Sequence, residues 1–345
     1  MTASSLPLRP LPLEHRAGLD VALGQRTDIE AFAARVVGAG LRNVYMTGSG
    51  GGLITFGPLQ YQLERRASRF PVFAMSANEL IHRGPVGLGA GSLVLVASNT
   101  GTTPEVVAAA RFARERGATV AAFTRRADSP LAAASDVAYA YGDDRGVGDP
   151  KHVALAILGL ALLRETGDLS AEEQAAHLRA LEALPDALLA ACRGSEELLA
   201  GIAAALKDEP IIYVLGSGPN HATAYALAMC YLQEMQWMHA ASFDAAEFLH
   251  GAMEVVTDEV PVILFLGEEE TRPIDERARA FLERWTKKAH FVDASDLALP
   301  GIEPALRPYV SAFALSSVMS RLAQHFEAAT GHDLAIRRYM FRVDY

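Results

Sequence analysis

The sequence predicts an α/β protein made of two similar halves, each a doubly wound parallel sheet with helices on both faces. Short apolar runs alternate with segments of helical length, which is typical of a parallel sheet built from βα units. A Gly-Ser-Gly triplet also follows a strand-like run in each half, starting at Gly48 and again at Gly216. The offset of 168 residues between these two glycines indicates duplication of a whole domain.

The first half contains the clearest strand. Residues 92–97 form a nearly continuous apolar run, as expected where a strand is covered on both faces. Residues 44–46 also read as a strand, and they lead into the glycine-rich stretch 48–52. Further strands are predicted at 119–123 and 137–141, and helices at 56–69 and 104–116.

The second half repeats this order, with strands predicted at 211–215, 260–266 and 290–292, and helices at 222–238 and 275–288. A helical stretch from 151 to about 205 separates the halves, and Ser170 precedes Ala-Glu-Glu as a helix cap would. We expect an N-terminal extension at 1–30, a first domain at 31–165, a helical linker at 166–205, and a second domain with a C-terminal tail at 206–345.

Composition narrows the functional classes. The chain has 345 residues, is 50% hydrophobic and carries a formal charge of −10, with both signs interspersed. This pattern argues against a nucleic-acid binder, which normally shows a clustered basic face. The longest apolar run, 153–163, is too short to span a bilayer and predicts a buried helix. Residues 1–12 show no signal pattern, so we expect a cytoplasmic protein.

The two cysteines, Cys192 and Cys230, lie in predicted helices without a CxxC pair. We therefore expect buried free thiols, with neither a disulfide framework nor a zinc site. His239, Glu247 and His250 also lack a recognised metal-ligand spacing, so no metal is expected.

The strongest motif is the turn Ser98–Thr103, which follows the apolar strand and carries four hydroxyls. Thr103 is well placed as a helix N-cap and Pro104 suits the first helical position. Hydroxyls and backbone amides at a helix N-terminus are suited to a phosphate monoester. The alternative is a merely polar connection between strand and helix.

The glycine-rich turn at Gly48 and Ser49 also lies at a strand end, where open α/β sheets bind ligands. It fits a dinucleotide fingerprint poorly, because Ile54 or Thr55 stands in place of the third glycine. A P-loop is excluded, because no Gly-Lys-Ser/Thr ending follows.

A carboxylate and an imidazole form the second group of candidates. Glu234 interrupts an apolar predicted helix, where a carboxylate is costly unless it is paired or used. His250 precedes a glycine, so it is expected in a loop or at a helix end. Together they would suit proton transfer, although each also has an ordinary structural interpretation. The basic, aromatic C-terminus at 337–345 fits either a packed tail or a cation brought to an active site.

These motifs together resemble the double sugar isomerase (SIS) domain family, whose members have tandem flavodoxin-like, three-layer αβα domains. Residues 232–239 and 247–251 resemble the isomerase half of glucosamine-6-phosphate synthase and, more closely, the fructosamine-6-phosphate deglycases. In both, a helix glutamate and a loop histidine sixteen residues later form the catalytic pair, and Glu234 and His250 have this spacing. The resemblance implies that six residues bind the phosphosugar: Gly48, Ser49, Ser98, Asn99, Thr100 and Thr103.

Departures from the synthase favour the deglycase branch. About forty residues precede the first turn, so we expect no ammonia generation from glutamine. The synthase's C-terminal lysine, which assists ring opening, is best matched by Arg342, which cannot form a Schiff base. Arg342 and Glu247 therefore remain possible accessory residues, and His250-Gly-Ala replaces the synthase's His-Gly-Pro.

The resemblance implies a deglycase that cleaves a 6-phosphorylated fructosamine to hexose 6-phosphate and a free amine. It also implies a homodimer in which the histidine loop reaches the neighbouring subunit. The chemistry of such a reaction needs no cofactor, and the charge and hydropathy patterns above predict neither nucleic acid nor a membrane as partner. An aldose–ketose phosphosugar isomerase would use the same glutamate, and a non-catalytic phosphosugar sensor is a third reading.

Overall fold

The computed structural model describes residues 6–142, 145–340 and 342–344, in two compact units. The first unit is Pro12–Pro185, and the second is Asp186–Tyr345 together with N-terminal residues up to Leu11. The boundary falls inside helix α9 (Ala171–Gly194), at Pro185, which lacks the N–H of a normal helical residue. Ser170 caps this helix as expected, because its hydroxyl accepts the N–H of Glu173 at 3.1 Å.

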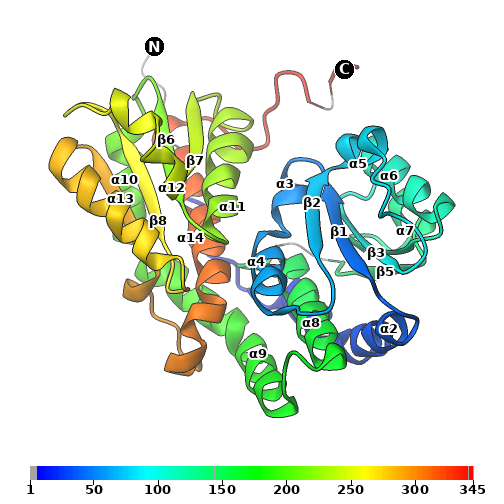
Figure 1. Ribbon diagram of the computed structural model, residues 1–345. Coiled ribbons are helices and arrows are strands. Elements are labelled where there is room, and N and C mark those ends of the chain that lie inside the picture. The colour runs from blue at the N-terminus through cyan, green and yellow to red at the C-terminus, as the bar shows by residue number, and fades with distance from the viewer. Residues whose placement is uncertain (1–5, 143–144, 341, 345) are drawn as a thin grey trace. The chain divides into compact units, whose positions relative to one another are not determined.

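The first unit contains a five-stranded parallel sheet in the order β2-β1-β3-β4-β5 (Figure 1). Its strands are β1 (Asn43–Gly48), β2 (Val72–Ser76), β3 (Ser92–Ala97), β4 (Thr119–Thr124) and β5 (Val137–Ala140). This is the flavodoxin-like strand order. The chain adds β2 on one side of β1 and the later strands on the other side, so the order of addition reverses between β1 and β3. Open α/β sheets bind their ligands at the carboxyl ends of the strands on either side of such a reversal.

Helices cover both faces of this sheet. They are α1 (Ala17–Gly24), α2 (Arg26–Gly38), α3 (Gly51–Ile54), α4 (Gly57–Arg66), α5 (Ala77–Arg83), α6 (Pro104–Glu115), α7 (Pro130–Ala133) and α8 (Pro150–Thr166). Helices α5 and α6 pack on one face, while α1, α2 and α4 pack with α8. Helix α8 is buried along nearly its whole length, as its apolar run predicted.

The second unit contains a four-stranded parallel sheet in the order β7-β6-β8-β9 (Figure 1). Its strands are β6 (Ile212–Gly216), β7 (Ala240–Asp244), β8 (Val262–Leu266) and β9 (Ala289–Asp293). Its helices include α10 (Glu196–Leu206), α11 (Asn220–Tyr225), α12 (Ala245–Phe248), α13 (Arg272–Trp285) and α14 (Arg307–Thr330). The order matches that of β2, β1, β3 and β4, which confirms two parallel α/β domains.

The two glycine-rich turns repeat each other in atomic detail. A Cβ on Gly48 would lie 2.6 Å from the backbone of Gly52, and a Cβ on Gly216 would lie 2.5 Å from the backbone of Asn220. Each turn also has a glycine of positive φ two residues after the first, Gly50 and Gly218. Only glycine permits this close approach of strand end and helix start, so the sequence offset of 168 residues marks a true structural repeat.

The predicted helix over 222–238 ends earlier than expected, at Gln233, and is not a regular α-helix throughout. After α11 the chain forms a π-helix, η1 (Ala226–Gln233), and Glu234 stands at its C-terminal end. A turn then leads to β7, and in it Trp237 has a φ of 58°, the one positive φ of a non-glycine residue among those described. π-Helices and strained backbone both occur most often at functional sites.

The remaining expectations concern the thiols and the membrane. Cys192 and Cys230 are free and buried, as predicted. Burial raises the pKa of each thiol to about 12, so both are neutral and unreactive at physiological pH. Within the described ranges, no helix has the length and apolar character needed to cross a bilayer.

Candidate active site

The two predicted sugar-binding turns meet at one edge of the first sheet. Gly48 pairs with Ala97 at the carboxyl ends of β1 and β3, so Ser49 and Ser98 leave the sheet side by side. A Cβ on Gly52 would lie 2.4 Å from the carbonyl oxygen of Ala97. The glycine-rich turn therefore packs directly on the start of Ser98–Thr103, which we call the hydroxyl turn.

Inside the hydroxyl turn, the side chains hydrogen-bond mainly with one another. Ser98 Oγ lies 2.9 Å from Thr103 Oγ1 and accepts the N–H of Gly101 at 3.2 Å. Thr100 and Thr102 form a second hydroxyl pair at 2.8 Å, on the exposed side of the turn. Gly101 has a φ of 68°, which lets the chain fold back sharply enough to form both pairs.

The expected capping role of Thr103 was only half right. Thr103 occupies the N-cap position of α6 and Pro104 its first position, as predicted, but the Thr103 side chain caps no helical N–H. Its hydroxyl is held by Ser98 instead. The cap is lost because the turn draws that hydroxyl inward, which leaves the N-terminus of α6 to interact with a ligand.

A buried ion pair lies behind the hydroxyl turn. Lys151 Nζ is 2.9 Å from Asp149 Oδ1, and its side chain is 9% exposed. Burial alone would disfavour both charges, but their mutual attraction lowers the pKa of Asp149 and raises that of Lys151. The ammonium lies 5.4 Å from the ring centroid of Tyr141, whose hydroxyl donates to Asn99 Oδ1 in the turn. The ion pair as a whole carries no net charge, so its role is to support the turn through the contact of Tyr141 with Asn99.

Glu234, the predicted base, is held in the second unit by an arginine. Arg337 Nε and Nη2 each lie 2.9 Å from Glu234 Oε1, and the two side chains are 14% and 23% exposed. Burial raises the pKa of Glu234, and the Arg337 guanidinium opposes this rise. A partly buried carboxylate with a raised pKa and a specific charge partner is typical of a general base.

The other predicted residues of this unit do not contact Glu234. His250 and Glu247 are both exposed, and they follow the far end of β7 from Glu234. Arg342 is also exposed, and the cation beside Glu234 is Arg337. Phe341 and Tyr345 of the C-terminal tail lie outside the described residues. No group of three potential metal ligands occurs in the part of the chain that the structure describes.

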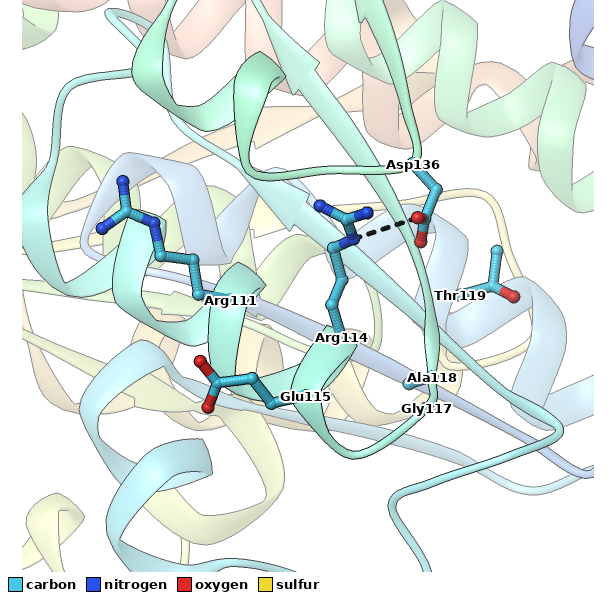
Figure 2. A pocket seen from close by; sticks show the side chains of 7 residues that line it. All are labelled: Arg111, Arg114, Glu115, Gly117, Ala118, Thr119 and Asp136. Carbon is cyan, nitrogen blue, oxygen red and sulfur yellow. Dashed lines mark ion pairs between the residues drawn. The ribbon is translucent and has the colours of Figure 1, made fainter.

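A hollow of about 560 Å³ lies elsewhere on the first unit (Figure 2). It is lined by the end of α6 and the start of β4, where Arg114 pairs with Asp136 at 3.0 Å. The strands are parallel, so this hollow is at the amino edge of the sheet, opposite the hydroxyl turn. Of the two arginines that line it, Arg114 is paired with Asp136, and the hollow lies away from the predicted binding turns, so we assign it no role in binding.

Both halves of the chain match a known protein family. The model of the SIS domain matches residues 42–148 and 205–295, more than half of the chain. The chain belongs to the SIS domain family. Both matched ranges contain a glycine-rich turn, and the first also contains the hydroxyl turn, so the resemblance that the motifs indicated is confirmed.

Individual relatives cover most of the chain. It is 33% identical to the fructosamine deglycase FrlB of Bacillus subtilis, over 92% of this chain and 97% of the relative. It is 29% identical to the fructoselysine 6-phosphate deglycase of Escherichia coli K12, over 80% and 79%. A solved structure assigned to the phosphosugar isomerases, from Bacillus subtilis, superposes with a TM-score of 0.88 at 32% identity, covering 94% of this chain and all of that one.

Proposed function

We propose that the protein is a deglycase that cleaves a 6-phosphorylated fructosamine to hexose 6-phosphate and a free amine. The observation that carries the proposal is Glu234, a partly buried carboxylate of raised pKa at the end of a π-helix. The similarity to a fructosamine deglycase along 92% of the chain supports the substrate class.

In this mechanism the hydroxyl turn, with Gly48 and Ser49, binds the 6-phosphate and fixes the sugar carbons relative to the catalytic groups. Glu234 takes a proton from C1 of the open-chain ketoamine while a proton is delivered to the C2 carbonyl oxygen, giving a 1,2-enaminol. Return of the proton to C2 gives a C1 imine, which water hydrolyses to the aldose and the amine. One water is consumed and no electrons are exchanged with a cofactor, because C1 is oxidised as C2 of the same molecule is reduced.

His250 is proposed as the group that delivers the proton to oxygen, acting in the active site of a neighbouring subunit. Its support is that the imidazole is exposed and forms no side-chain hydrogen bond or ion pair within the described residues. It also follows the opposite end of β7 from Glu234. We accordingly propose a homodimeric, cytoplasmic enzyme, with Glu247 and Arg342 as possible accessory residues.

An aldose–ketose isomerase is the second candidate, because solved relatives are assigned to the phosphosugar isomerases. It would use the same transfer of a proton from C1 to C2. The two reactions differ in whether an amine leaves, and a sensor would bind the phosphosugar without turnover.

The test is release of lysine and glucose 6-phosphate from 6-phosphofructosyl-lysine. In Glu234→Gln the rate should fall about 10²–10⁴-fold, because the base is lost while the shape is kept. Glu283→Gln, an exposed carboxylate on α13, serves as the matched control and should retain full activity. Binding of the substrate to Glu234→Gln should persist by calorimetry. Amine release at the wild-type rate in Glu234→Gln would refute Glu234 as the base, and fructose 6-phosphate isomerisation without amine release would favour the isomerase.

A further inference from the structure

The chain after α14 wraps the turn that carries Glu234. We call residues 234–237 the base turn and residues 331–340 the C-terminal segment. Gln236 Nε2 donates to the carbonyl oxygen of His332 at 2.7 Å, and the hydroxyl of Thr330 donates to Gln236 Oε1 at 2.6 Å. The Trp237 ring lies 4.4 Å from the ring of His332. The backbone of the base turn is hydrogen-bonded to η1, while its side chains are held by residues about a hundred positions later.

Arg337 of this segment contacts Glu234 in a geometry that suits the proposed role of Glu234 as a base. Both of its close nitrogens contact the same oxygen, Oε1, in place of bridging the two carboxylate oxygens. Within the described residues, Oε2 accepts no hydrogen bond. A carboxylate that is held by one oxygen keeps its orientation while the other oxygen remains able to take a proton.

Backbone carbonyl groups of the C-terminal segment hold the guanidinium of Arg337 in place. Arg337 Nη1 donates to the carbonyl oxygens of Leu334 at 2.6 Å and of Ile336 at 3.1 Å. The backbone N–H of Leu334 donates to Glu327 Oε1 at 2.9 Å, which anchors the segment to α14. Arg337 thus reaches Glu234 as part of an ordered loop, which lowers the entropic cost of the ion pair.

We propose that Arg337 is a positioning residue for the reaction, which holds the Glu234 carboxylate by one oxygen and leaves the other able to take a proton. This inference rests on the proposed function, since it concerns the same carboxylate. It differs from the role suggested for Arg342, which was matched to a ring-opening lysine.

The titratable groups that face Glu234 determine whether removal of Arg337 raises or lowers the pKa of this carboxyl. They are the guanidinium of Arg337 and, on η1, the thiol of Cys230, which is neutral below its raised pKa of about 12. Burial raises the pKa of Glu234 and Arg337 lowers it. Removal of Arg337 therefore raises the pKa of Glu234 further, and the acidic limb of the kcat profile moves to higher pH.

The experiment compares the pH profile of amine release in wild type, Arg337→Ala, Arg337→Lys and Arg338→Ala. Arg338 is the matched control, because it lies on the same segment but stacks on Trp237, 4.3 Å from the ring centroid. In Arg337→Ala we expect the acidic limb of kcat to move up by about 1 pH unit or more and kcat near neutrality to fall about tenfold. KM should change less than about threefold. Arg337→Lys should recover part of the shift, and Arg338→Ala should show none.

A second measurement does not need turnover. The glutamate carboxyls are labelled with ¹³C and titrated by NMR, with the Glu234 signal assigned by its absence in Glu234→Gln. A higher titration midpoint in Arg337→Ala supports the proposal even if the wild type releases no amine, in which case the proposed function alone fails. Equal midpoints in folded wild type and Arg337→Ala, or an equal shift in Arg338→Ala, would overturn it.

Discussion

The turns after β3 and after β8 occupy the same place in the two sheets but have opposite chemistry. The offset of 168 residues aligns Thr103 with Thr271, and each stands just before a helix, α6 or α13. It aligns Gly101 with Glu269, which is 4% exposed. Where the first turn has a glycine and a ring of hydroxyls, the second has a buried carboxylate.

Glu269 is surrounded by donors much as a bound anion would be. It accepts from Asn220 Nδ2 at 2.7 Å, from the hydroxyl of Ser311 at 3.0 Å and from that of Thr271 at 3.2 Å. Burial raises its pKa, and these hydrogen bonds oppose the rise. The second turn therefore contains its own anion, while the first presents donors at its surface.

The largest expected effect comes from giving the first turn the chemistry of the second. Thr100→Glu places a carboxylate on the exposed side of the hydroxyl turn, where it repels a phosphate. Affinity for fructose 6-phosphate should fall about 10³-fold, or about 4 kcal/mol. Calorimetry should show a much smaller loss for the neutral Thr100→Gln, and equal losses in the two variants would mean that the turn does not bind the phosphate.

The next effect tests whether the first turn requires a glycine. In Gly101→Ala the new Cβ would lie 2.4 Å from Ser129 Cβ, at a φ of +68°. The combined clash and strain should lower the free energy of unfolding by about 3 kcal/mol, measured in urea. Gly167→Ala is the control, with a φ of +81° and open space around the Cβ, and should cost about 1 kcal/mol. Equal losses would show that the close contact with Ser129 is relieved without cost.

The sequence predicts well what is local or strongly apolar. The central strand β3 is a continuous run of buried residues, and it was found without difficulty. The edge strands β2 and β7 were missed, although Val72–Met75 of β2 are all apolar; their residues are mostly partly buried or exposed, as is usual at a sheet edge. The π-helix has the composition of an ordinary helix, so Glu234 was placed in the helix and not at its end.

Long-range partners were the main gap in the candidate site. Arg337 lies 103 residues from Glu234, and nothing in the local sequence distinguishes it from its neighbour Arg338. Thr102, in contrast, could have been proposed from the sequence, because it belongs to the same hydroxyl-rich stretch as the residues proposed to bind phosphate. Lys151 could also have been singled out from the sequence, because it is a charged residue at the start of a largely apolar helix.

The smallest effect concerns the buried acid next to the second turn. Asp275 on α13 is fully buried, and its Oδ2 accepts the N–H of Gly267 at 3.4 Å. Burial, and to a lesser degree the charge of Glu269, raises the pKa of Asp275 to about 7. A carboxyl raised in the folded state stabilises the fold while it is protonated, and this contribution is lost as the pH rises through about 7.

Wild-type stability should therefore fall by about 2 kcal/mol from this group between pH 5 and pH 7, relative to Asp275→Asn, which has no proton to lose. Urea unfolding at both pH values measures the difference, with the exposed Asp208→Asn as a control that should follow the wild type. A parallel pH dependence in wild type and Asp275→Asn would show that Asp275 ionises without cost. The turn that contains Glu269 would then be more accessible to water than its burial indicates. Only Glu269 would then distinguish this turn from the hydroxyl turn.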